Sequence, residues 1–444
     1  MTTMAESKPT STKTIQVHAL ARVEGEGALT IHMANGEVQD VQLRIYEPPR
    51  FYEAFLRGRM ASETPDITAR ICGICPVAYQ MSAVHAVEKI FDVTITEPIR
   101  LLRRLLYCGE WIESHTLHMF FLHLPDFVGH ESALSMAQAK PEWAAIVRQA
   151  LRIKKAGNAI VKAVGGREVH PINVKVGGFY RAPHRDDLTG LLPELHWSRA
   201  TMLQLLDWLK QLSYPEMDVM HPWVALRHEQ DYPMNEGRVV SSNGLDIAVE
   251  HFLDHFSEYQ VPHSNALHAR MQTSQGNGAY QVGPIARWNL NADRAPALVQ
   301  QTAQALGLMP PINNPFHSLL IRGLEVLLAL DEAIRLIEAQ PRPQPASIPY
   351  EAKAGEGAAI TEAPRGILFQ KYVTAADGSI REAVITPPTS QNQKSIELDI
   401  WQMAPHLVQL ADEDATFLAE RVIRNYDPCI SCATHFLKLK VIGR

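Results

Sequence analysis

Cysteine, positive charge and long apolar runs are all scarce in this chain of 444 residues. Five cysteines are too few for an extracellular disulfide framework in a chain of this length. The 42 basic and 48 acidic residues give a net charge of −6, which argues against non-specific binding to nucleic acid. No run approaches the roughly 18 consecutive apolar residues of a membrane span. Residues 1–13 are polar and lack the apolar region of a secretory signal, so we expect a cytoplasmic protein.

The rest of the composition is ordinary for a globular protein, with 46% hydrophobic and 20% charged residues. Apolar residues recur at intervals of three and four in the segments that we expect to be long helices: 76–91, 99–124, 143–164, 188–212, 316–339, 396–410 and 412–426. Alternating segments predict strands at 15–23, 28–33, 38–46, 367–373 and 379–385, with hairpin turns at Asn35-Gly36 and Asp377-Gly378. These patterns predict a mainly helical α+β fold, a bundle of long helices with small peripheral antiparallel sheets. We expect residues 1–14 to form a flexible tail and residues 15–444 a single domain.

Four of the five cysteines form two Cys-x-x-Cys loops at opposite ends of the chain, Cys72–Cys75 and Cys429–Cys432. Each such loop places two sulfurs on one side of a turn, close enough to hold one metal ion. Together the loops supply four thiolates, which select zinc, iron or nickel over magnesium or calcium. If the four sulfurs share one site, the two ends of the chain must converge.

Spacing alone leaves three functions open for these thiols. The first is a structural zinc site, although paired zinc loops usually lie closer together than Cys75 and Cys429, which are 429 − 75 = 354 positions apart. The second is a pair of independent dithiol redox sites, for which neither loop has the expected βαβ context. The third, a catalytic redox metal centre, is the one that we favour.

Five motifs follow one another along the chain: Arg22-Val23-Glu24-Gly25, Arg70-Ile71-Cys72-Gly73-Ile74-Cys75, Glu362-Ala363-Pro364-Arg365-Gly366, Pro387-Pro388-Thr389-Ser390-Gln391-Asn392 and Asp427-Pro428-Cys429-Ile430-Ser431-Cys432 with His435. In this order they resemble the large subunit of nickel–iron hydrogenases, over residues 17–435. The chain is most similar to the cytosolic, bidirectional NAD(P)-linked group, and within it to the sulfhydrogenase alpha chains. The resemblance implies the helical fold of those subunits and reversible heterolytic cleavage of H2 into protons and electrons.

The same resemblance assigns the metal ligands. It implies that Cys72 and Cys429 are terminal ligands of nickel, while Cys75 and Cys432 bridge nickel and iron. The iron would also hold carbon monoxide and cyanide. Metal and thiolates would together form the catalytic centre.

Further roles around the centre are implied residue by residue. Glu24 would take the proton from Cys429, since burial can raise the pKa of a carboxylate toward neutrality. Arg365 would lie over the open coordination position, oriented by a charge-assisted hydrogen bond to Asp427. The diatomic ligands of the iron would contact three more residues: Pro388 and Thr389 at the cyanides, and Leu368 at the carbonyl.

A second, redox-inert ion is also implied by the resemblance. Glu53 and His435 would ligate this ion, usually magnesium, or iron in its place. Two features depart from the family pattern. Tyr79 stands where many relatives carry histidine, and residues 436–444 follow His435, where relatives are often cut.

Electron transfer requires partners that this chain cannot replace. Beyond the four paired cysteines only Cys108 remains, and one cysteine cannot hold an iron–sulfur cluster. No Gly-x-Gly-x-x-Gly fingerprint for a nicotinamide cofactor is present. We therefore expect an iron–sulfur small subunit, and the resemblance implies a flavin-bearing NAD(P)-binding subunit. The alternative is a non-catalytic, zinc-stapled or complex-I-like structural subunit, but the quinone-site subunit of complex I lacks the four cysteines.

Overall fold

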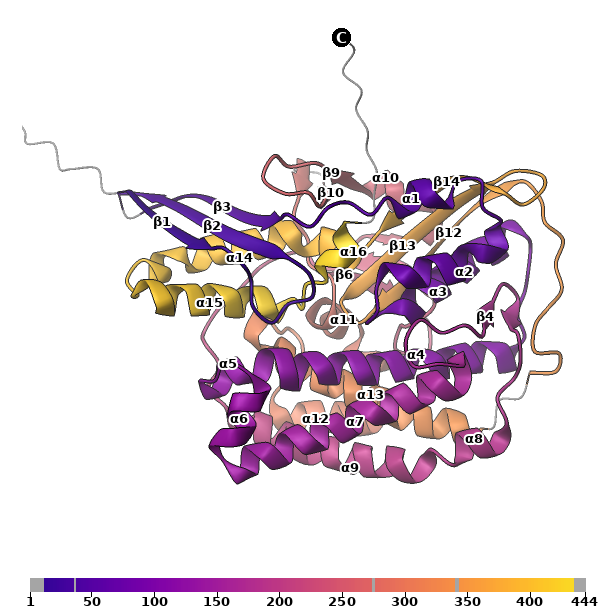
Figure 1. Ribbon diagram of the computed structural model, residues 1–444, viewed down its shortest axis with the longest axis horizontal. Helices are drawn as coiled ribbons and strands as arrows, with labels where there is room; N and C mark the ends of the chain where they lie inside the picture. Colours follow the sequence, from indigo (N-terminus) through magenta and orange to yellow (C-terminus); the bar gives the residue numbers. More distant parts are fainter. Residues whose placement is uncertain (1–11, 36, 274–275, 340–342, 435–444) are drawn as a thin grey trace, which may run out of the picture.

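The computed structural model describes residues 12–35, 37–273, 276–339 and 343–434, and it divides into a helical half and a half that carries the sheets (Figure 1). Long helices stack in the lower half of the view: α4 (Glu97–Leu117), α7 (Pro141–Gly165), α9 (Leu192–Leu209), α12 (Ala297–Leu306) and α13 (Ser318–Glu338). Nearly every residue of α13 is buried, so this helix forms the centre of the bundle.

Helices α4 and α7 approach each other closely because two glycines lie at their contact. A Cβ atom built on Gly157 would stand 2.7 Å from the carbonyl oxygen of Gly109. Any larger side chain at that point would push the helix axes apart. This close packing positions Glu110 of α4. Its carboxylate accepts hydrogen bonds from the backbone N–H groups of Val77 and Ala78, which directly follow the first cysteine loop.

The other half contains small antiparallel sheets. One sheet has the order β1 (Thr12–Val17), β2 (Gly27–Ala34), β3 (Glu37–Ile45) and packs its apolar face on α14 (Pro388–Leu407) and α15 (Asp412–Asn425). A second sheet has the order β12 (Gly355–Ala363), β13 (Gly366–Thr374), β14 (Ile380–Thr386) and packs against α3 (Pro76–Ile90). The remaining strands form three smaller sheets: β4 (Val174–Lys175), β5 (Gly178–Phe179), β6 (Val224–Arg227), β7 (Arg238–Ser241), β8 (Asp246–Ile247), β9 (Phe256–Tyr259), β10 (His268–Thr273) and β11 (Gly276–Gly278).

Short helices connect these elements. The α-helical ones are α1 (Tyr52–Leu56), α2 (Thr64–Thr68), α5 (Leu124–Val128), α6 (Ala133–Ala139), α8 (Arg185–Thr189), α10 (Phe252–His255), α11 (Pro284–Asn291) and α16 (Ile430–Ala433). The others are the 3-10 helices η1 (Ala61–Glu63), η2 (Ala69–Ile71), η4 (Val249–His251), η5 (Ala292–Arg294) and η6 (Pro315–His317), and the π-helix η3 (His118–His123). Among the described residues, no helix combines the length and apolar character needed to cross a lipid bilayer.

The predicted mainly helical α+β fold is confirmed, but several boundaries were wrong. The strand predicted at 15–23 ends at Val17. β1 begins at Thr12, inside the predicted tail. The predicted helix 188–212 is interrupted after α8, and α9 begins at Leu192. α14 begins at Pro388 rather than near residue 396, because its first turns are polar yet buried, which hid them from an apolar pattern.

Several predictions fall on residues outside the described ranges. These are Gly36 of the first hairpin, the tail residues 1–11, His435 and the segment 436–444. The hairpin at Asp377-Gly378 is described and confirmed, since β13 and β14 pair as antiparallel strands on either side of it. The single-domain organisation of residues 15–444 stays a prediction.

Candidate metal centre

The two cysteine loops meet in the interior of the molecule. The sulfur of Cys72 lies 3.5 Å from that of Cys429, and the sulfur of Cys75 lies 3.8 Å from that of Cys432. Cys429 and Cys432 are 2.7 Å apart at their sulfurs, and all four side chains are buried. Metal–sulfur bonds of about 2.3 Å place two thiolates on one tetrahedral ion roughly 3.8 Å apart, so the donor set fits a soft metal.

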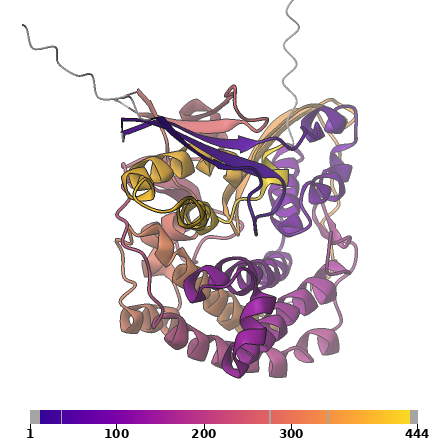
Figure 2. The ribbon, with the colours of Figure 1, turned by 60° about the vertical axis from the view of Figure 1, so that its left-hand side comes forward.

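Local structure explains how the sulfurs come to face one another. Cys72 follows η2, and Cys75 is the residue before α3, whose first position is Pro76. Cys429 precedes α16, which Figure 2 shows in yellow beside the indigo segment that contains α1–α3. One thiol of each loop, that of Cys75 or Cys429, therefore lies at the start of a helix.

Arg50 joins the two cysteine loops, and sequence reasoning missed it. Its Nη2 group donates a hydrogen bond to the carbonyl oxygen of Ile71 at 2.6 Å and another to the carbonyl oxygen of Ser431. Its backbone N–H donates to the carbonyl oxygen of Thr434 at 2.6 Å. One arginine thus contacts both ends of the chain at the site. No pattern in the sequence marks it out, because its partners are backbone atoms.

Glu24 lies directly against the second loop. Its backbone forms a parallel bridge with Cys429, and its carbonyl oxygen accepts from the N–H of Ile430 at 3.0 Å. Its Oε2 accepts from the N–H of Ser431 at 3.0 Å and lies 3.0 Å from the sulfur of Cys429. Gly25 follows with φ of +88°, and a Cβ there would stand 2.7 Å from the Cβ of Ile430, so only glycine permits this approach.

Arg365 occupies the tight turn between β12 and β13. Its Nε donates to the carbonyl oxygen of Asp427 at 2.6 Å, and its Nη2 donates to Oδ1 of Asp427 at 3.1 Å. The turn lies against Gly283, where a Cβ would stand 2.8 Å from the carbonyl oxygen of Arg365. The predicted pairing of Arg365 with Asp427 is therefore present in the structure.

Charge balance keeps this arginine ionised beside the thiols. Burial by itself would lower the pKa of Arg365, but Asp427 and then the sulfurs of Cys429, Cys75 and Cys72 hold that pKa well above its usual value. Burial raises the pKa of the Cys429 thiol, and the neighbouring sulfur of Cys432 adds to the increase. A bound cation would reverse this effect on the thiols, because a metal ion stabilises thiolates.

Among the other predicted residues, Thr389 contacts the second cysteine loop. Thr389 lies in the first turn of α14, and its Oγ1 accepts a hydrogen bond from the N–H of Cys429 at 3.0 Å, which leaves its own O–H able to donate elsewhere. Pro388 is the first residue of α14, and Leu368 is fully buried in β13. Tyr79 is fully buried as well, and its pKa is raised first by burial and then by the sulfurs of Cys432 and Cys75.

Glu53 lies against β14 rather than against the cysteine loops. Its Oε1 accepts a hydrogen bond from the N–H of Ile385 at 2.8 Å, and its side chain lines a pocket with Glu258 and Thr386. Its predicted partner His435 lies outside the described residues. The second metal site therefore stays a prediction.

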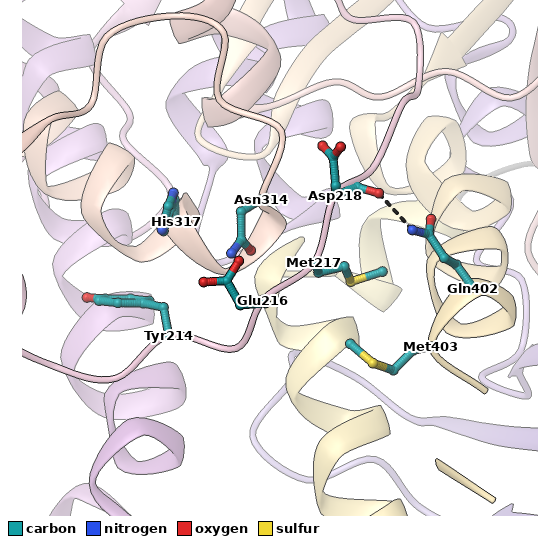
Figure 3. Close-up of a pocket in the computed structure, with 8 residues that line it drawn as sticks. All are labelled: Tyr214, Glu216, Met217, Asp218, Asn314, His317, Gln402 and Met403. Carbon is teal, nitrogen blue, oxygen red and sulfur yellow. Dashed lines mark hydrogen bonds between the residues drawn. The ribbon is translucent and has the colours of Figure 1, made fainter. Parts of the chain in front are cut away.

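A larger surface pocket lies elsewhere, where the loop after α9 meets α14 (Figure 3). It is lined by Tyr214, Glu216, Met217, Asp218, Asn314, His317, Gln402 and Met403. The Nε2 group of Gln402 bridges it by donating to the carbonyl oxygen of Asp218 at 2.7 Å. None of the four paired cysteines lines this pocket, so its size does not identify the reactive centre.

Comparison with known proteins agrees with the geometry. The family described as nickel-dependent hydrogenase matches residues 50–148 and 277–435. The alpha chain of sulfhydrogenase 1 from Pyrococcus furiosus is 33% identical over 435 residues, covering 96% of this chain and 98% of that protein. The alpha chain of sulfhydrogenase 2 from the same organism is 31% identical over 432 residues, covering 96% of this chain and 100% of that protein.

Solved structures show the same fold. An NAD+-reducing [NiFe]-hydrogenase in its H2-reduced state superposes with a TM-score of 0.86 at 24% identity, covering 95% of this chain and 99% of that chain. The [NiFeSe]-hydrogenase of Dm. baculatum superposes with a TM-score of 0.76 at 20% identity, covering 96% of this chain and 100% of that chain. The residues matched by the family span more than half of the chain, and the 33% identity extends over nearly all of it. The chain therefore belongs to the nickel-dependent hydrogenase family.

Proposed function

We propose that this chain is the catalytic large subunit of a nickel–iron hydrogenase that cleaves H2 reversibly into protons and electrons. One observation carries the proposal: sulfurs from loops 354 positions apart converge within 3.5 and 3.8 Å of each other in a buried site. A structural zinc staple is not needed to hold a chain of this size together. Membership of the nickel-dependent family favours nickel over zinc at these thiols.

The four thiolates would hold the nickel–iron pair. Cys72 and Cys429 would be terminal ligands of nickel, and Cys75 and Cys432 would bridge the two metals. When bound, the pair supplies the Lewis-acid and redox chemistry that splits H2. Carbon monoxide and cyanide on the iron would be surrounded by the buried residues Leu368, Pro388 and Thr389, with the Thr389 hydroxyl available as a donor.

Glu24 is proposed to carry the proton away from the centre. The 3.0 Å between its Oε2 and the Cys429 sulfur allows direct transfer. Beyond it, the Ser431 hydroxyl donates to Oε1 of Glu47 at 3.1 Å, while the Ser431 N–H holds Glu24. Glu47 is partly exposed, so Ser431 lies between the proton-accepting carboxylate and a second carboxylate that reaches solvent.

Arg365 is proposed to act on the substrate side of the metal pair. Its Nη1 atom is buried and has no hydrogen-bond partner among the described residues, while Nε and Nη2 are held by Asp427. A fixed cation with one unused donor suits polarisation of H2 or a hydrogen bond to a cyanide. Asp427 is then a positioning residue for the guanidinium.

A second ion at Glu53 and His435 is proposed as magnesium, or iron in its place. The carboxylate of Glu53 and its neighbour Glu258 supply the oxygen-rich surroundings that magnesium prefers. Such an ion would hold the end of the chain after Cys432 against β14, through the contact of Glu53 with Ile385.

Electrons are proposed to leave through an iron–sulfur partner that docks near the first cysteine loop. Two segments contact the backbone just before Cys72: the Tyr52 hydroxyl donates to the carbonyl oxygen of Arg70, and His170 Nδ1 lies 2.7 Å from the carbonyl oxygen of Ala69. These segments carry large apolar side chains that are exposed, namely Phe51, Phe55, Val169, Ile172 and Tyr180. Exposed apolar groups that gather around a redox centre are typical of an interface between subunits.

NAD(P) is proposed as the further electron carrier, handled by a flavin-bearing subunit of the same cytoplasmic complex. The likeness to the NAD+-reducing [NiFe]-hydrogenase, whose name includes that carrier, supports this part of the proposal. H2-dependent reduction of NAD and of NADP by the whole complex would distinguish the two nicotinamides.

Metal analysis tests the central proposal. The purified complex should contain one nickel per large subunit, and infrared spectra should show bands from carbon monoxide and cyanide. One zinc and no nickel at the four thiols would overturn the proposal and support the structural alternative.

A further inference from the structure

A second cluster of metal-ligating side chains lies apart from the four thiols. His263 precedes β10, His268 is the first residue of β10, and Glu397 lies in the middle of α14. One ligand atom from each of the three side chains lies within 4.8 Å of the others. The Nε2 atom of His263 is 2.8 Å from Oε1 of Glu397, and the two imidazole rings are 5.6 Å apart at their centres.

Backbone contacts hold the loop that carries His263. The N–H of Asn265 donates to the carbonyl oxygen of Ile45 at 2.7 Å. The Nε2 group of Gln393, on α14, donates to the carbonyl oxygen of Leu267 at 2.7 Å. The loop is therefore fixed to β3 on one side and to α14 on the other, which places the two histidines before any ligand arrives.

His268 is the unusual member of the cluster. Its side chain is fully buried, yet neither ring nitrogen has a hydrogen-bond partner among the described residues. Burying an imidazole without a hydrogen-bond partner costs about 1–3 kcal/mol of folding free energy. A ligand bound to the ring would offset this cost.

The cluster is separate from the second ion proposed at Glu53. Leu267 and Ala269, the neighbours of His268 in sequence, line the pocket that contains Glu53, whereas His268 does not. Successive side chains of a strand point to opposite faces, which places His268 away from that pocket. The inference therefore does not depend on the function proposed above.

We propose that His263, His268 and Glu397 bind one zinc ion. Two imidazole nitrogens and one carboxylate oxygen suit zinc and exclude magnesium and calcium, which prefer oxygen alone. Bonds of about 2.0–2.1 Å on a tetrahedral ion place donor atoms roughly 3.4 Å apart, so the present spacing needs only small side-chain movements. Three protein ligands leave the fourth position for water.

Lys394 competes with a metal ion for the carboxylate of Glu397. Its ammonium group donates to Oε2 of Glu397 at 3.0 Å, on the same helix, and its side chain is 40% exposed. Zinc would displace this ammonium toward solvent, while Oε1 of Glu397 keeps its hydrogen bond from the N–H of Leu43 at 3.1 Å. The bound ion would tie the β9–β10 loop to the helix whose first turn holds Thr389 against Cys429.

Zinc binding to the intact complex tests the proposal. The complex, with its nickel and iron in place, is treated with a chelator, loaded with zinc and freed of unbound metal. We expect one additional zinc per large subunit, with X-ray absorption showing only nitrogen and oxygen neighbours at about 2.0–2.1 Å. His268→Asn, His263→Asn and Glu397→Gln should each weaken zinc binding by about tenfold or more.

A histidine outside the cluster supplies the matched control. His251 is exposed and pairs with Asp254, so His251→Asn should retain the zinc. If His268→Asn fails to fold, His263→Asn decides the question, because the His263 side chain is 19% exposed whereas that of His268 is fully buried. Retention of zinc by the cluster variants, sulfur neighbours at about 2.3 Å, or no zinc at all would each overturn the proposal.

Discussion

Replacing Glu24 by glutamine isolates proton transfer from every other role of this residue. The variant keeps the length of the side chain and an oxygen that can accept from the Ser431 N–H, a contact of 3.0 Å in the parent chain. It cannot take up and release a proton as a carboxylate does. The cysteine sulfurs and their spacing are untouched, so the metal content should not change.

The size of the effect follows from the geometry. Glu24 Oε2 is 3.0 Å from the Cys429 sulfur, within the reach of direct proton transfer. A positioned acid or base contributes about 10²–10⁴-fold to a rate, which corresponds to about 2.7–5.5 kcal/mol in the barrier. We therefore expect Glu24→Gln to lower H2 oxidation with an artificial electron acceptor by at least about 100-fold.

The assay pairs this rate with nickel and iron analysis on the same sample. Glu26→Gln is the matched control, because Glu26 is exposed and lies two positions beyond the residue that contacts Cys429; we expect this variant to keep near-parent activity. If Glu24→Gln retained half of the parent rate with full metal content, proton transfer through Glu24 would be ruled out. Loss of metal together with activity would instead mean that Glu24 supports the second cysteine loop.

Three further predictions concern metal binding, stability and pH. Cys432→Ser should abolish nickel incorporation and H2 activity, measured by metal analysis, whereas nickel retained at the parent level would contradict the four-thiolate site. Arg50→Met should lower the free energy of unfolding by about 3 kcal/mol, since charge-assisted hydrogen bonds contribute about 1.5–3 kcal/mol each and Arg50 donates to Ile71 and Ser431; an unchanged melting temperature would refute this role. Burial raises the pKa of Glu113 from 4.5 to about 8, so the folded state keeps a proton that the unfolded chain releases, and stability should fall as pH rises through that window. Glu113→Gln should flatten the dependence of melting temperature on pH, and an unaltered slope would show that Glu113 is not its source.

The sequence predicted those site residues whose side chains themselves carry the chemistry. The four cysteines, Glu24, Arg365 and Asp427 all lie in short motifs, and the structure brings these seven together. Arg50, Ser431 and Glu47 were missed as functional residues. They act through backbone atoms or through each other, and such contacts leave no spacing pattern to detect.

The fold shows the same division. Helices with a regular apolar stripe were located from the sequence, as in 143–164 for α7 and 412–426 for α15. The start of α14 and the whole of β12 were not. Both are buried on most sides, so they lack the alternation between apolar and polar residues on which such predictions depend.

By itself the sequence determined which atoms are available for chemistry: four soft thiolates, a carboxylate and a guanidinium, with too few other cysteines for a cluster. Tertiary structure alone decided that these atoms meet, because residues from both ends of a chain become neighbours only through packing on the helical bundle. It also decided which histidines are paired with oxygen and which, like His268, are buried without a partner among the described residues. Burial and distance are properties of the folded chain, and both reactivity and metal affinity depend on them.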